Sequence, residues 1–410
     1  MSVFIAGAGM TATGKHPAAT VKSLTAAAVT AALADAGAEP GQVEAAWFCN
    51  TRQGVLEGQH GIRGQVALRA AGFERIPIFN TDNACASSSS GLIQAYAAIA
   101  AGLYDSALVI GAEKMVFPEK RAAMFEAFLG STDRDLMEQH LDGLLRSAVT
   151  EDMVETEGER SIFMEIYAAQ ARLHMKTFGT TERQIAVVAS KNHGHSQANP
   201  LAQYRFPMSV EEVLADRPVA WPLTRSMCAP MSDGAAALLL VSDRLAARLG
   251  STRAVRIAGL GASSGSDRAP EDYRGHLTRT AAERCYAMAG IGPDAVSLAE
   301  IHDATAIAEI IQSEHLGLCD YGDGGPHAES GKSRIGSAQP INVSGGLLSK
   351  GHPIGATGAM QICELVTQLR GEAGERQVEG ARIGLAENGG GFHGVEEAAC
   401  VVTLLEAPSR

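Results

Sequence analysis

Cys85 is the first residue whose surroundings suit covalent chemistry. It lies in the serine-rich segment Asn83–Gly91, between a predicted strand, Pro77–Phe79, and a predicted helix. Free backbone N–H groups at a helix start, together with the positive end of the helix dipole, favour a thiolate over a thiol. We therefore expect a cysteine with a lowered pKa that acts as a nucleophile at neutral pH. A buried, inert cysteine is the alternative, and the local sequence alone leaves both open.

His352 lies in a second segment of this kind, Asn342–Gly358, which is rich in glycine and ends where another helix is predicted to start. The small neighbours would leave the imidazole facing a cleft. Placed near a thiol, an imidazole can take its proton. We expect His352 to act as a base toward Cys85, although a lone histidine is more often a structural residue.

Two further polar blocks follow predicted strands. Glu300–Ala304 contains His302 at a strand end, where open α/β sheets bind their ligands, although a polar strand end without function is the alternative. Glu387–Gly394 contains three consecutive glycines, whose N–H groups could approach a substrate closely, as an oxyanion hole requires. The alternative for this block is a flexible turn before the last predicted strand, Ala399–Leu405.

The elements that position these residues occur twice along the chain. Ala36–Val43 matches Ala289–Val296 at an offset of 253 residues, and Gly91–Gln94 matches Gly358–Gln361 at an offset of 267. Each match joins an alanine-rich helix pattern to an apolar strand. The pattern predicts an α/β protein with two similar β-α-β halves and mostly parallel sheets covered by helices. Chance similarity between alanine-rich helices is the alternative.

We place the first half at residues 1–250 and the second at residues 251–410. A region of about residues 113–207, with helical periodicity and no strand signal, is predicted to be an inserted, largely helical loop domain. The apolar run Ala235–Val241 then completes the first half as a strand buried on both faces.

Composition excludes several classes of function. The formal net charge is -12 and aromatic residues make up 5%, so we expect neither nucleic acid nor a membrane as a partner. The seven cysteines form no C-x-x-C pair, which indicates free thiols in the cytoplasm and no metal site. The N-terminus has no basic flank and is predicted to be a strand, not a signal peptide.

Together the four blocks resemble the thiolase superfamily, above all through the sequence G-H-P-I-G-A-T-G that contains His352. His302-Asp303-Ala304-Thr305 looks like the H-D-C-F of thiolases related to sterol carrier protein X, and Lys191–His193 also resembles that branch. The resemblance implies a five-layered α-β-α-β-α thiolase fold and assembly as a homodimer or tetramer. It also implies an acyl-CoA substrate and no resident cofactor. Because the chain ends soon after the last predicted strand, we expect no separate sterol carrier domain.

The resemblance also implies roles for individual residues. Cys85 corresponds to the acylated nucleophile, and His352 to its base and to a donor toward the thioester oxygen. His302 corresponds to the residue that completes this oxyanion hole. The backbone N–H groups of Cys85 and Gly389 correspond to a second oxyanion hole. The activity implied is that of an acyl-CoA C-acyltransferase that works by a ping-pong mechanism. It would cleave a 3-ketoacyl-CoA or transfer the acyl group to a carbon nucleophile.

The chain departs from the family at the second catalytic cysteine. We align that cysteine of the C-x-G-G-G motif with Glu387, and that of H-D-C-F with Ala304. We therefore expect Glu387 to face Cys85 and, with a pKa raised by burial, to act as the α-carbon base; a role only in orienting the loop is the alternative. Two other functions stay open: a thiolase-like aldolase that acts with a small accessory protein, and a non-catalytic acyl-CoA binding protein.

Overall fold

The computed structural model describes residues 1–149, 161–250 and 252–408. Nine of the strands form one sheet in the order β3-β2-β4-β7-β1-β8-β11-β10-β9, and β5 and β6 form a separate two-stranded ribbon. The strands are β1 (Val3–Met10), β2 (Ala45–Cys49), β3 (Ile78–Thr81), β4 (Ser106–Glu113), β5 (Pro218–Ala220), β6 (Leu223–Thr224), β7 (Gly234–Ser242), β8 (Val255–Ser264), β9 (Leu298–Glu300), β10 (Ile383–His393) and β11 (Glu396–Glu406).

The order of these strands confirms the two predicted halves. In the first half β2 pairs parallel to β3 and β4, and then β4, β7 and β1 pair antiparallel. In the second half β9 pairs parallel to β10, and then β10, β11 and β8 pair antiparallel. On the outer side of β9, Ala299 forms a parallel bridge with Ile341, and this bridge occupies the position that β3 has beside β2 in the first half. The halves are joined where Phe4 and Ile5 of β1 pair with Arg256 and Val255 of β8.

The prediction of mostly parallel sheets is wrong. Among the described strands, five of the eight neighbouring pairs in the large sheet are antiparallel. Strands β10 and β11 are separated by only two residues, and so short a connection can join only antiparallel neighbours. The apolar run that we expected to be buried on both faces forms β7, in which every residue is buried.

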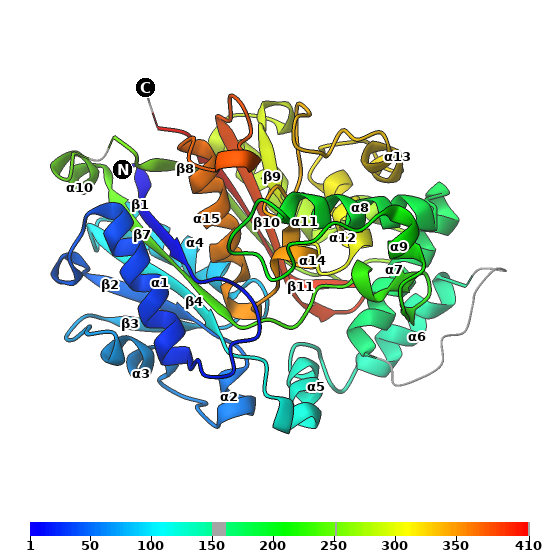
Figure 1. Cartoon of the computed structure of the whole chain (residues 1–410), viewed down its shortest axis with the longest axis horizontal. Helices are drawn as coiled ribbons and strands as arrows, with labels where there is room; N and C mark the ends of the chain where they lie inside the picture. Colours follow the sequence, from blue (N-terminus) through cyan, green and yellow to red (C-terminus); the bar gives the residue numbers. More distant parts are fainter. Residues whose placement is uncertain (150–160, 251, 409–410) are drawn as a thin grey trace.

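Helices and strands alternate in five layers, which confirms the predicted thiolase-type α/β fold. Helix α1 covers the sheet of the first half, α11 covers that of the second, and α4 and α15 contact each other between them (Figure 1). The helices are α1 (Val21–Ala36), α2 (Gln53–Glu57), α3 (Arg63–Ala70), α4 (Ser87–Ala100), α5 (Arg121–Leu129), α6 (Met137–Ser147), α7 (Ile162–Phe178), α8 (Glu182–Ser196), α9 (Val210–Leu214), α10 (Asp243–Arg248), α11 (Leu277–Ala289), α12 (Ala306–His315), α13 (Gly324–Glu329), α14 (Gly346–Lys350) and α15 (Thr357–Leu369).

The two central helices approach each other most closely near their first turns. A Cβ atom at Gly358 would lie 1.9 Å from the Oγ atom of Ser89, so only glycine permits this contact. Ser88 Oγ also accepts a hydrogen bond from the N–H of Ala359, 2.9 Å away. This close crossing brings together the segments that precede the two helices, and these segments carry Cys85 and His352.

The insertion between β4 and β7 is longer than predicted, because it continues past residue 207 through α9, β5 and β6 to residue 233. Its described part is largely helical, and α8 contacts α12, α13 and α14 of the second half. Residues 150–160 of the predicted insertion lie outside the described residues, as does residue 251. The division of the chain at residue 250 stays a prediction. None of the described helices combines the length and the apolar character needed to cross a membrane.

Candidate active site

Cys85 lies at the N-terminal end of α4, as predicted. Ala84 has a φ of 49°, and this left-handed residue turns the chain into the helix. The turn is fixed by Ser87, whose hydroxyl donates to the carbonyl of Ala84 at 2.6 Å and accepts from the N–H of Asn83 at 2.9 Å.

The expected lowering of the thiol pKa is wrong for the protein without substrate. Loss of solvation raises the pKa of Cys85 to about 11, and this effect outweighs the opposing effects of Arg52 and of the N–H of Gly391. Partial charges at a helix start cannot replace the water that the surrounding residues exclude. In the absence of substrate, Cys85 is therefore a neutral thiol at pH 7.

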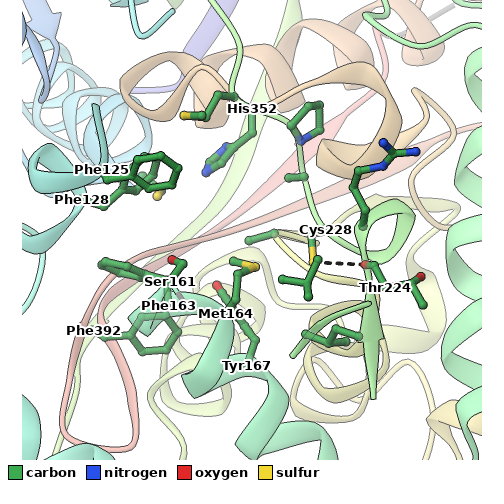
Figure 2. A pocket seen from close by; sticks show the side chains of 18 of the residues that line it. Phe125, Phe128, Ser161, Phe163, Met164, Tyr167, Thr224, Cys228, His352 and Phe392 are labelled. Carbon is green, nitrogen blue, oxygen red and sulfur yellow. Dashed lines mark hydrogen bonds between the residues drawn. The ribbon is translucent and has the colours of Figure 1, made fainter. Parts of the chain in front are cut away.

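His352 lies between α14 and α15 and points into the cavity (Figure 2). Its Nδ1 atom lies 2.7 Å from Oγ1 of Thr357, and that hydroxyl donates in turn to the carbonyl of Pro353 at 3.2 Å. Since the hydroxyl hydrogen is used there, Thr357 accepts from Nδ1–H and Nε2 is left without a proton. Burial lowers the pKa of His352 well below its ordinary value, which favours this neutral form. His352 can therefore accept a proton at Nε2.

His302 has the opposite tautomer. The amide nitrogen of Asn388 donates to Nδ1 of His302 at 2.9 Å, while the amide oxygen of Asn388 accepts from the hydroxyl of Ser89 at 2.7 Å. With Nδ1 as an acceptor, the neutral ring carries its proton on Nε2. Burial lowers the pKa of His302 to about 3 and so keeps the ring neutral. His302 can therefore donate a hydrogen bond from Nε2, as an oxyanion hole requires.

The structure brings together Cys85, His302 and His352. One donor or acceptor atom of each lies within 4.8 Å of those of the other two, and the two imidazole rings meet edge to face with centroids 5.2 Å apart. A thiol thus lies beside one ring that accepts a proton and another that donates a hydrogen bond. The absence of a metal here stays a prediction.

These three residues lie on the wall of a cavity of about 1540 Å³. Figure 2 shows the rings of Phe125, Phe128, Phe163 and Phe392 gathered on one side. Met164 and Tyr167 also line the cavity, and so do four arginines: Arg52, Arg121, Arg217 and Arg225. Arg52 is buried, whereas the other three are exposed. The cavity therefore has aromatic rings on one side, basic groups exposed to solvent and one buried cation near the thiol.

The glycine-rich block is part of strand β10 and is not a flexible turn. Gly390 and Gly391 line the cavity, and Gly389 does not. A Cβ atom on Gly390 would lie 2.3 Å from the carbonyl oxygen of Asn83, so the strand passes directly beside the Cys85 segment. The N–H groups of Gly391 and of Cys85 itself act on the Cys85 sulfur, and that of Gly389 does not.

Glu387 does not face Cys85 as we expected. Successive side chains of a strand point to opposite faces, and in β10 Asn388 is the residue that reaches His302. Glu387 is fully buried on the other face, where it accepts from the N–H of His302 at 2.9 Å and from the thiol of Cys400 at 3.5 Å. Burial raises the pKa of Glu387 to about 8, in the predicted direction.

The cavity wall also carries groups that were not expected from the sequence, among them Arg52, Cys228 and Glu397. The N–H of Ala229 donates to the carbonyl of Ala304 at 3.0 Å, so Cys228 lies next to the position where related enzymes have a cysteine. No local motif marks these residues, because their segments reach the cavity only through the tertiary fold.

Known proteins resemble this chain over nearly its whole length. A family model described as "Thiolase, N-terminal domain" matches residues 3–214, more than half of the chain, and one described as "Thiolase C-terminal domain-like" matches residues 248–403. The chain is 37% identical to the acetyl-CoA acetyltransferase of Methanothermobacter thermautotrophicus, over 88% of this chain and 89% of that one. It is 34% identical to the sterol carrier protein 2 of Oryctolagus cuniculus, over 98% of this chain and 71% of that one.

A solved structure described as "Ltp2-ChsH2(DUF35) aldolase" covers 100% of this chain and 98% of its own, with a TM-score of 0.76 and 22% identity. At this identity the likeness shows the fold alone. The two family models and both sequence relatives agree with the resemblance seen in the motifs and with the five observed layers. The chain therefore belongs to the thiolase family of acyltransferases.

Proposed function

We propose that this protein is an acyl-CoA C-acyltransferase that works by a ping-pong mechanism through an acyl thioester on Cys85. The observation that carries the proposal is the meeting of Cys85, His302 and His352 on one cavity wall, with opposite tautomers on the two histidines. The name of the archaeal relative, acetyl-CoA acetyltransferase, supports the same chemistry.

In the first half-reaction, the Cys85 sulfur attacks the thioester carbonyl while Nε2 of His352 takes the thiol proton. Because the pKa of the thiol is raised and that of His352 is lowered, this transfer accompanies the attack and does not precede it. The carbonyl oxygen gains negative charge and accepts from Nε2–H of His302. The bond between the acyl carbon and the CoA sulfur then breaks, and the CoA sulfur leaves with the proton held by His352.

The exposed arginines suit the other end of the substrate. Arg121, Arg217 and Arg225 line the cavity where it is open to solvent, and Arg225 already pairs with Asp216 at 3.0 Å. Phosphates of coenzyme A are held by such groups in spite of the overall negative charge of the protein. We expect the acyl group to extend inward past the phenylalanine rings.

For the second half-reaction we propose Glu397 as the base that acts at the α-carbon, in place of Glu387. Glu397 lines the cavity, and burial raises the pKa of its carboxyl to about 7. Gln312 donates to its Oε1 at 3.2 Å. Its buried Oε2 accepts no hydrogen bond from the described residues, and Nε2 of His276 lies 3.5 Å away. A carboxyl with a pKa near neutrality can take and return a proton at pH 7.

The first experiment incubates the protein with a panel of acyl-CoAs and measures its intact mass. Wild-type protein should gain one acyl group on Cys85, and Cys85→Ala should gain none. A stable, folded protein that accepts no acyl group from any member of the panel would refute the proposal. That result would favour one of the two other functions. One is a non-catalytic acyl-CoA binding protein, and the other is an aldolase like the solved structural neighbour, since retro-aldol cleavage needs no acyl-enzyme.

The second experiment compares two buried glutamates that differ in position. Glu397→Gln should form the acyl-Cys85 adduct but should fail to exchange substrate α-protons with deuterated water. Glu387→Gln is the matched control, because Glu387 also has a raised pKa but does not line the cavity, and it should retain both reactions. Loss of exchange in the control alone would return the role to Glu387.

The homodimer, the cytoplasmic location and an accessory protein also stay predictions.

A further inference from the structure

Arg52 is a buried cation on the cavity wall near the nucleophile. It follows β2 and precedes α2, and only 4% of its surface is exposed. Its charge acts on Cys85 and on His352, which places the guanidinium within electrostatic reach of both. Neither the proposed acylation nor the binding of CoA phosphates at the exposed arginines uses this residue.

The guanidinium has no acidic partner in the part of the chain that the structure describes. Among the described residues, no carboxylate lies within ion-pair distance of Arg52. Its Nη1 donates to the carbonyl of Ala127 and its Nη2 to the hydroxyl of Ser131 at 2.8 Å, while the buried Nε has no acceptor. The ring of Phe128 covers one face, with its centroid 5.1 Å from the guanidinium carbon. Arginine has five N–H bonds, so three of them have no acceptor among the described residues.

Glu113 and Asp82 are acids whose charges act on Arg52 from beyond ion-pair distance, and the oxygens of Glu113 are directed elsewhere. Oε1 accepts from the N–H of Arg52 and from the amide of Asn50, both at 2.9 Å. Oε2 accepts from the N–H of Thr51 at 3.1 Å and of Gly355 at 3.0 Å. Glu113 thus fixes the backbone of the segment, and among the described residues it makes no direct ion pair with the guanidinium.

A buried cation that no carboxylate contacts is costly, and part of this cost is recovered when an anion binds to it. A guanidinium with free N–H bonds matches the two oxygens of a carboxylate. The CoA phosphates belong to the open part of the cavity, whereas the acyl group has to reach Cys85. We infer that Arg52 binds a free carboxylate on the acyl group, so that the preferred substrates are acyl-CoAs with a second, unesterified carboxyl group. This inference rests on the proposed acyltransferase function.

The test compares pairs of acyl-CoAs in which one member ends in a carboxylate and the other in an isopropyl group of similar size. Three pairs vary the length: malonyl and isovaleryl, succinyl and 4-methylpentanoyl, and glutaryl and 5-methylhexanoyl. The second-order rate of Cys85 acylation is measured by rapid quenching and intact mass. For at least one pair, wild-type protein should prefer the carboxylate by about 10- to 100-fold, the range expected for hydrogen bonds to a charged group.

Arg52→Gln should abolish this preference by slowing the carboxylate member of the pair, and Arg52→Lys should keep part of it. Arg121→Gln is the matched control, because this exposed arginine lines the same cavity, and it should slow both members alike. If Arg52→Gln does not fold, the wild-type ratios still decide. An equal loss for both members in Arg52→Gln would overturn the inference and make Arg52 a residue that acts on the thiol. Wild-type preference for the isopropyl member of every pair would also overturn it and leave the acyltransferase proposal intact. Only a protein that no acyl-CoA acylates would refute that proposal.

Discussion

Replacing Thr357 by valine tests the assignment of the two tautomers. The side chain of Thr357 is 1% exposed, and its hydroxyl oxygen lies 2.7 Å from Nδ1 of His352. Valine has nearly the same shape but accepts no hydrogen bond. The carbonyl of Pro353 keeps a partner, since the N–H of Ala356 donates to it at 2.8 Å. The substitution therefore removes the acceptor of His352 and little else.

The size of the effect follows from the buried N–H group. Leaving a buried donor unsatisfied costs about 1–3 kcal/mol. His352 can avoid this cost by moving its proton to Nε2, but Nε2 then cannot accept the proton of Cys85. Acylation requires the tautomer whose Nδ1–H now lacks an acceptor, so the cost of reaching this tautomer appears in the barrier. At about 1.36 kcal/mol for each factor of ten, the rate should fall about 5- to 150-fold.

The assay is the single-turnover formation of acyl-Cys85 at saturating acyl-CoA, followed by rapid quenching and intact mass. Thr357→Ser retains the hydroxyl and should acylate at nearly the wild-type rate. Thermal unfolding of each variant shows whether the fold is intact. A folded Thr357→Val protein with the wild-type rate of acylation would refute the idea that this hydrogen bond holds His352 as the base.

Three further predictions concern other parts of the molecule. Because the pKa of Cys85 is raised to about 11, its alkylation by iodoacetamide should speed up roughly tenfold per pH unit between pH 7 and 10, and a plateau below pH 8 would contradict this. Burial raises the pKa of Glu387 to about 8, so between its ordinary pKa and pH 8 the folded protein holds a proton that the unfolded chain has lost. Glu387→Gln should therefore gain stability relative to wild type as the pH rises from 5 to 8 in urea unfolding, and a constant difference would count against it. Phe79 is 43% exposed on the edge strand β3, so Phe79→Asp should dissociate the proposed homodimer in sedimentation, whereas a wild-type monomer would remove that proposal.

The sequence by itself determined the halves of the fold and the chemistry-bearing segments. The repeated β-α-β patterns predicted the duplicated strand order, and β7 could be identified because a run of apolar residues needs burial on both faces. Cys85 and His352 could be located because each lies in a segment of small residues just before a helix. Such features depend on neighbours along the chain, so no tertiary structure is needed to see them.

Only the tertiary structure decided how these groups titrate and which others join them. The pKa of Cys85 depends on the solvent that distant segments exclude, and this effect reverses the prediction made from the helix start. Glu387 and Asn388 are neighbours in β10, so their side chains point to opposite faces of the strand. Asn388 contacts the Nδ1 atom of His302 and Glu387 points away from the cavity, which sequence alignment alone could not show. Arg52 reaches the cavity without any motif around it, because its position follows from how β2 lies beside the insertion. Solvation and the direction of side chains are properties of the packed molecule, so the sequence pattern could not give them.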